Sequence, residues 1–145
     1  MPFNLSAQQG EDPTVNLVDD IQFDVYSSEI RGDTLEVKLF AISYQKNPRE
    51  FRMNVFASGL LDSLGQSHMF HSVQADRVIV QLADRQNYLN YLLHQDKPVQ
   101  LTLKVAPITE EISAGKQVKL VFSSLEEEGR FIEALIDLEP DTASD

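Results

Sequence analysis

Apolar residues alternate with polar residues along much of this chain, and this two-residue period constrains the fold more than any other feature. The longest clean stretch places Val99, Leu101, Leu103 and Val105 between polar neighbours. Successive side chains of a β-strand point to opposite faces, so the period is typical of a strand with one buried face. We therefore predict that these four side chains enter the core from a central strand. The same period recurs at residues 21–25, 35–39, 51–55 and 118–122.

Turn-forming residues separate these stretches at near-regular intervals. Examples are Arg31-Gly32-Asp33, Lys46-Asn47-Pro48-Arg49 and Asp62-Ser63-Leu64-Gly65, since Gly, Pro, Asn and Asp favour tight turns. Seven to eight short strands joined in this way predict an all-β fold, an antiparallel immunoglobulin-like β-sandwich. The chain has no Cys and no Trp, which excludes the disulfide and core Trp of antibody domains. We predict one domain over residues 14–139, with an irregular lead-in at 1–13 and an acidic tail at 140–145.

One segment departs from the two-residue period. Tyr88, Tyr91 and Leu92 have the i, i+3, i+4 spacing of one helical face, and Asp84 is a suitable N-cap. We therefore expect one short helix near residues 84–94. His94 would then lie at the C-terminus of that helix, where a cation is favourable.

The last segment, residues 125–139, fits two structures. Ser124-Leu125-Glu126-Glu127 resembles a helix capping box, which favours a helix. The two-residue period of Ile132, Ala134, Ile136 and Leu138 favours a strand, and Glu128-Gly129-Arg130 is suited to a hairpin turn. Gly inside a helix costs about 1 kcal/mol. We favour the strand, because the neighbouring strands need a closing partner.

The negative charge is concentrated at the two ends of the chain. The net charge is −11, residues 1–24 and 126–145 together carry −12, and residues 25–125 carry +1. Such a protein repels phosphates, so nucleic acid is excluded as a partner. In a sandwich the first and last strands are expected to be neighbours, which would bring Asp19, Asp20 and Asp24 close to Glu133, Asp137 and Glu139. That acidic face would make stability rise with ionic strength and would suit a basic protein partner.

No motif of catalysis or metal binding is present. The chain lacks G-x-S-x-G, H-E-x-x-H, P-loop and G-x-G-x-x-G patterns. His68 and His71 are three residues apart in a strand-like stretch, so their side chains would point to opposite faces. Asp19-Asp20, Asp62 and Glu126-Glu127-Glu128 are carboxylates that Ca²⁺ could use, but without the spacing of a calcium loop. We predict no catalytic, cofactor-binding or metal-binding residue, and no cofactor. No apolar run is long enough for a transmembrane segment.

Several short motifs follow one another in a characteristic order. A strand ends at Asp24-Val25-Tyr26, Gly32-Asp33-Thr34-Leu35-Glu36-Val37 follows, and a D-x-x-G turn is at Asp62–Gly65. Lys97-Pro98-Val99 then opens a strand that closes at Val105-Ala106-Pro107. Over residues 20–139 this order resembles the immunoglobulin-like domains of unknown function found in bacterial lipoproteins and other exported proteins. The resemblance implies a non-catalytic domain and assigns no catalytic residues.

Together these features predict a non-enzymatic interaction or accessory module of an exported bacterial protein, most simply a monomer. The alternative is a β-sandwich that binds a small ligand, or a carbohydrate with calcium; a hydrolase of another type ranks third. The N-terminus has no signal peptide, so the location is extracytoplasmic if a leader was removed and cytoplasmic if Met1 is native. The residues expected at an interaction surface are Tyr88, Tyr91, Asp19, Asp20, Asp24, Glu133 and Asp137.

Overall fold

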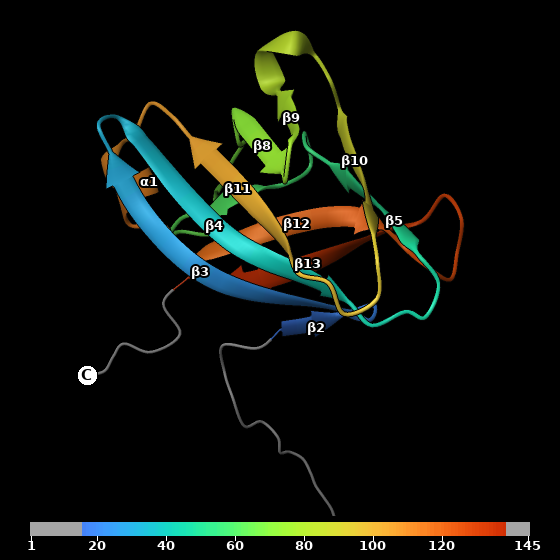
Figure 1. The fold of residues 1–145 in the computed structure, drawn as a ribbon. Helices are drawn as coiled ribbons and strands as arrows, with labels where there is room; N and C mark the ends of the chain where they lie inside the picture. Colours follow the sequence, from blue (N-terminus) through green and yellow to red (C-terminus); the bar gives the residue numbers. More distant parts are fainter. Residues whose placement is uncertain (1–15, 139–145) are drawn as a thin grey trace, which may run out of the picture.

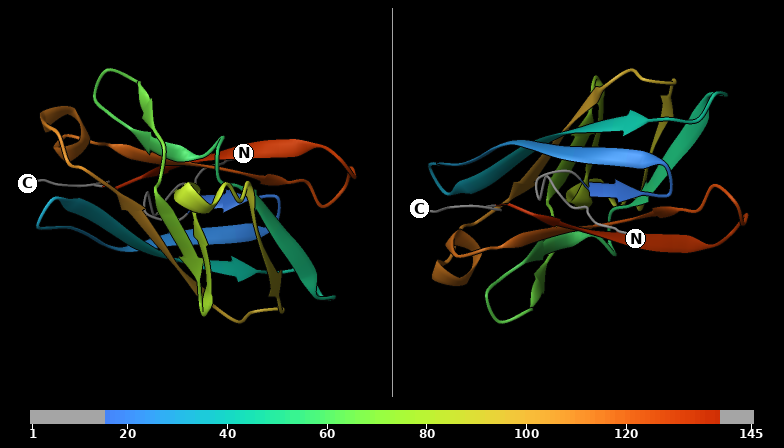
Figure 2. Two further views of the ribbon diagram at one scale, coloured as in Figure 1. Left: turned by 90° about the horizontal axis from the view of Figure 1, so that it is seen from above. Right: turned by 90° about the horizontal axis from the view of Figure 1, so that it is seen from below.

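A computed structural model describes residues 16–138 of the protein, and these residues form two antiparallel β-sheets packed face to face (Figure 1, Figure 2). The predicted all-β antiparallel fold is therefore confirmed. The described part holds twelve strands, several of them only two to four residues long, where the alternation predicted seven to eight. The predicted lead-in at 1–13 and tail at 140–145 lie outside the described residues.

One layer, called here the β4 sheet, has six strands and contains the cleanest alternating stretch of the sequence. Leu101 and Leu103 on β11 are buried, whereas Gln100 is exposed. β11 pairs with β4 on one side and β8 on the other, so the prediction of a central strand with this register is confirmed. The strands in spatial order are β2 (Asn16–Val18), β3 (Ile21–Arg31), β4 (Thr34–Ser43), β11 (Val99–Val105), β8 (Ser72–Ala75) and β9 (Val78–Gln81).

The other layer, called here the β12 sheet, is organised around β12 (Gln117–Ser123). β13 (Phe131–Asp137) pairs with β12 along its whole length. On the other edge of β12, β5 pairs near its end and β6 pairs near its beginning. The remaining strands of this sheet are β10 (Tyr88–Leu93), β5 (Arg49–Asn54), β6 (Gly59–Leu61) and β7 (Ser67–His68). A single helical turn, α1 (Glu110–Ser113), connects β11 to β12 and is capped by the Thr109 hydroxyl.

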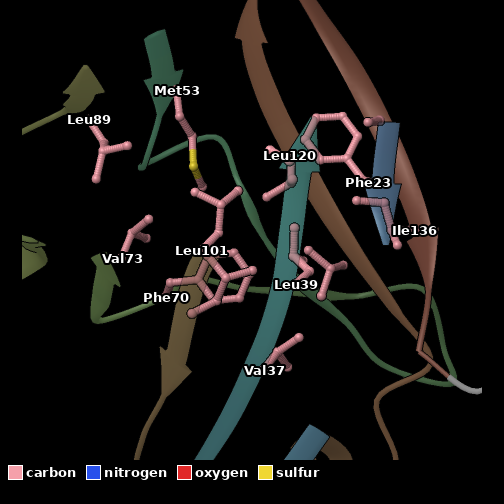
Figure 3. Close-up of a cluster of buried hydrophobic side chains, with 14 of the residues drawn as sticks. Phe23, Val37, Leu39, Met53, Phe70, Val73, Leu89, Leu101, Leu120 and Ile136 are labelled. Atoms are coloured by element: carbon pink, nitrogen blue, oxygen red, sulfur yellow. The ribbon is translucent and has the colours of Figure 1, made fainter. Parts of the chain in front are cut away.

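The core lies between the two sheets and is built from their inward-facing apolar side chains (Figure 3). Three aromatic rings hold its centre together: Phe23 lies 5.6 Å from Phe122, and Phe122 lies 5.3 Å from Phe51, measured between ring centroids. Phe23 belongs to the β4 sheet and the other two rings to the β12 sheet. This cluster therefore fixes how the two layers sit on each other, because aromatic pairs have preferred geometries as well as a large buried area.

The prediction of a short helix near residues 84–94 is wrong. Only Leu82–Asp84 forms a 3-10 turn, and it ends at Arg85, whose backbone is left-handed with φ 60°. Tyr88–Leu93 is instead the strand β10, which pairs with β5 over six residues and buries Leu89 and Leu93. The helical spacing of Tyr88, Tyr91 and Leu92 did not decide the structure, because pairing with β5 gives a strand that buries these leucines on one face. His94 therefore caps no helix; it is exposed in the turn after β10.

The strand favoured for the last segment is confirmed as β13. Ser124 does cap backbone amides, but they belong to a loop and not to a helix. Its hydroxyl accepts hydrogen bonds from the amides of Glu126 and Glu127. The backbone then turns at Gly129, whose φ of 85° favours glycine. Ser124 and Arg130 are joined across this loop by a backbone hydrogen bond of 2.8 Å. The result is a hairpin between β12 and β13.

Candidate functional site

The two acidic segments are neighbours, but their carboxylates do not share one face. β3 and β13 contact each other across the core. Asp24 alternates with buried Phe23 and so lies on the outer surface of the β4 sheet. Glu133 and Asp137 alternate with buried residues of β13 and lie on the outer surface of the β12 sheet. The predicted single acidic face is therefore wrong, and the expected rise of stability with ionic strength loses its basis. Glu139 lies outside the described residues.

Asp19 has a structural role, because it binds a buried arginine. Asp19 lies in the turn between β2 and β3, and its carboxylate and carbonyl oxygens both accept hydrogen bonds from the Arg49 guanidinium. Arg49 also donates to the Ser123 carbonyl at 3.1 Å, and the Leu125 amide donates to the Asp19 carboxylate at 2.8 Å. The Arg49 side chain is only 2% exposed. This Arg49 clamp joins the β4 sheet to the start of β5 and the end of β12.

An open hollow of about 440 Å³ lies beside the clamp and is lined by Asp19, Asp20 and Glu126, among others. Two of its three carboxylates already have partners, because the side-chain amide of Gln45 donates to Asp20 and the Arg49 guanidinium donates to Asp19. Within residues 16–138, no group of three or more His, Asp or Glu side chains is arranged to hold a metal ion. The hollow therefore gives no support to calcium-dependent binding.

Asp62 organises the D-x-x-G loop from a nearly buried position. One carboxylate oxygen accepts the amides of Leu64 and Gln66 at 2.8 and 3.0 Å, and the other lies 2.8 Å from Nε2 of His68. The hydrogen bond with His68 is the main reason that the pKa of Asp62 is held below its usual value. His71 does not join this pair; its backbone pairs with Lys104 and Leu82. The Asp62–His68 contact therefore fixes a loop.

Tyr88 and Tyr91 point to opposite sides of β10, so the prediction that they share one face is wrong. Tyr91 packs against the core, and its hydroxyl donates to Asp76 at 3.0 Å. That hydrogen bond raises the pKa of Tyr91 and ties β10 to the turn between β8 and β9. A hollow of about 240 Å³ next to this bond is bordered by His94 and Lys97. Tyr88 points outward instead, because residues three apart on a strand face opposite ways.

Tyr88 takes part in a stack on the outer face of the β12 sheet. Its ring centroid lies 5.9 Å from that of Phe131, with the ring planes 29° apart. The Cζ atom of Arg52 lies 4.1 Å from the centroid of the Tyr88 ring. These three residues come from β10, β13 and β5, so the stack reaches across the strands on either side of β12 (Figure 1). Glu133, Leu135 and Asp137 continue this face along β13.

We call this surface the stack face and define it by Arg52, Tyr88, Phe131, Glu133, Leu135 and Asp137. Three of the predicted surface residues, Tyr88, Glu133 and Asp137, lie on it. The alternating pattern also separates the two arginines of β5. Arg49 has the same parity as the buried residues of β5, and Arg52 has the opposite parity. That parity alone distinguishes the buried arginine from the exposed one.

No family model, curated protein or solved structure matches the sequence or the fold. In the part of the protein that the structure describes, no helix has the length and apolar character needed to cross a membrane.

Proposed function

We propose that this protein is a non-catalytic, immunoglobulin-like β-sandwich module that binds a protein partner through the stack face. The observation that carries the proposal is the Arg52–Tyr88–Phe131 stack on the outside of a sheet. Aromatic residues and arginine are the types enriched in the energetically important parts of protein interfaces. The rings are also held in place before binding, which reduces the entropy lost when a partner docks.

The apolar surface beside the stack supports the same function. Leu135 is 45% exposed on β13 and lies on the same outward side of that strand as Phe131. Glu133 and Asp137 flank Leu135 along the strand, so an apolar centre has a charged border, as in many interfaces. The polar clusters elsewhere, at Arg49 and Asp62, have their hydrogen bonds satisfied within the fold and hold loops together. The resemblance to immunoglobulin-like domains of exported bacterial proteins is consistent with a binding role.

The proposal is tested by placing a photo-crosslinking amino acid at Leu135. Ile79 is the matched control, because it is 50% exposed and lies on an edge strand of the opposite sheet, facing outward. Both full-length variants are irradiated in extract from the cells that produce the protein. We expect an adduct of one defined mass from position 135 and none from position 79.

Competition with unlabelled protein shows whether the adduct at position 135 comes from specific binding. Unlabelled wild-type protein should suppress the adduct, whereas unlabelled Tyr88→Ala protein, shown to be folded by circular dichroism, should suppress it less well. Equal adducts from both positions, or an adduct that wild-type protein does not suppress, would refute binding at the stack face.

A further inference from the structure

We infer that Arg52 is the anchor of the stack face and that it binds the carboxylate of an Asp or Glu side chain of the protein partner. This inference rests on the proposed function, because it names the chemistry by which the same surface selects its partner. The grounds are the contact that holds Arg52 on Tyr88, the absence of an acceptor for its guanidinium within residues 16–138, and the charges of the neighbouring side chains.

Arg52 is held in place by contacts that use none of its hydrogen-bond donors. Its guanidinium lies over the Tyr88 ring, and the Phe131 ring stacks on the Tyr88 ring in turn. Stacking on an aromatic face uses the flat side of a guanidinium and leaves its N–H donors at the edge. The side chain has therefore already lost much of its freedom, and this loss is a large part of the cost of binding through an arginine.

Among residues 16–138, no acceptor pairs with the Arg52 guanidinium, whereas three other arginines have such partners. Arg49 donates to Asp19, Arg31 pairs with Glu29 and Glu36, and Arg130 pairs with Glu127. Within residues 16–138, Arg52 forms no ion pair and no side-chain hydrogen bond. Arg77 and Arg85 also form no ion pair and no side-chain hydrogen bond within these residues, but neither lies over an aromatic ring in the described part of the protein. Arg52 alone among the described arginines thus combines a fixed position with free donors.

The chemistry of the ligand follows from the charges around Arg52. A guanidinium presents paired N–H donors that match the two oxygens of a carboxylate. Glu50 lies two residues earlier on the same outward side of β5, and Glu133 lies on the same face. Two nearby negative charges repel any anion, but they repel a doubly charged phosphate more than a singly charged carboxylate, so the free donors of Arg52 favour the carboxylate over the phosphate. An apolar side chain next to the partner's carboxylate would pack on the rings of Tyr88 and Phe131.

The inference is tested by NMR titration of the full-length protein with two short peptides. The first is acetyl-Leu-Glu-Leu-amide, and the second replaces Glu with Gln, which keeps the shape and removes the charge. The Nε–H signal of Arg52 and the ring signals of Tyr88 report the contact, and the Nε–H signal of Arg77 is the matched control. We expect saturable shifts at Arg52 with the Glu peptide, and about tenfold weaker binding of the Gln peptide, as for loss of a charge-assisted hydrogen bond.

Three results would overturn the inference. One is the absence of Arg52 shifts at about 10 mM Glu peptide, beyond the range of weak but specific binding. Another is an equal response to both peptides, or equal shifts at Arg77. The third is a stronger response of Arg52 to inorganic phosphate than to acetate, which would assign the site to phosphate.

A second experiment distinguishes loss of the role of Arg52 from loss of partner binding at the stack face. The crosslinking experiment at position 135 is repeated with the exposed Arg52 changed to Lys, which keeps the charge but loses the paired donors. If the inference is right, the adduct should weaken about tenfold. If the adduct is unchanged, the stack face still binds a partner, but Arg52 is not its anchor.

Discussion

Replacing Arg49 with Met removes a charged group that is almost wholly inside the protein. Its guanidinium joins Asp19, in the turn of one sheet, to the Ser123 carbonyl at the end of β12. Met is an unbranched side chain that fills irregular space, so the variant tests the charge and its hydrogen bonds more than the packing. The Asp19 carboxylate and the Ser123 carbonyl would both lose the donor that Arg49 supplies.

The expected loss of stability can be estimated from the surroundings of the pair. Breaking a buried ion pair by removing one partner costs about 3–5 kcal/mol. The Asp19 side chain is 17% exposed and keeps the Leu125 amide as a donor, so water and that amide offset part of the cost. We therefore expect Arg49→Met to lower the free energy of unfolding by about 3 kcal/mol, the lower end of that range.

Urea unfolding at pH 7, followed by far-ultraviolet circular dichroism, measures this loss. The matched control is Arg52→Met on the same strand, where an exposed cation–π contact is worth about 1 kcal/mol or less. The double variant Asp19→Asn/Arg49→Met should lose less than the sum of the single variants, because both disrupt one interaction. An Arg49→Met loss below about 1 kcal/mol, or strict additivity, would refute a stabilising role for the clamp.

Further predictions concern the core strand, the Asp62 loop and calcium. Leu103→Ala should cost about 2–5 kcal/mol in urea unfolding, whereas Gln100→Ala, on the exposed side of the same strand, should stay within about 0.5 kcal/mol; similar losses would mean that the register of β11 is wrong. Because folding lowers the pKa of Asp62, its contribution is complete above the ordinary value of 3.8 and is lost as the pH falls through the lower folded pKa. Unfolding measured from pH 6 downward should therefore show a shallower acid-side loss for Asp62→Asn than for wild type, and identical slopes would contradict this. Adding Ca²⁺ should leave the melting temperature unchanged, since a ligand of the folded state must raise it; a saturable rise would favour the calcium-dependent alternative.

The hydrophobic period, together with the turn residues between its stretches, was sufficient to predict the all-β antiparallel fold and much of the core. Where only one period fits, as at Leu101 and Leu103, burial follows directly from sequence, because side chains of a strand alternate between core and solvent. The C-terminal segment fitted a helix and a strand, and the strand was favoured because Gly129 suits a turn and the neighbouring strands need a closing partner. The number of strands was less predictable, since strands of two to four residues carry too little periodic signal.

Long-range pairing decided the rest. Residues 88–93 have the spacing of a helical face, and only the pairing with β5 made a strand the better way to bury Leu89. The acidic segments were correctly expected to be neighbours, but which outer surface each carboxylate faces depends on the sheet to which its strand belongs. Arg49 and Asp19 are 30 residues apart. Arg52 contacts Tyr88, and Tyr88 contacts Phe131, only after their three strands have assembled. Sequence determines the periodicity of each strand by local geometry, whereas contacts between distant side chains depend on which strands pair and in what register.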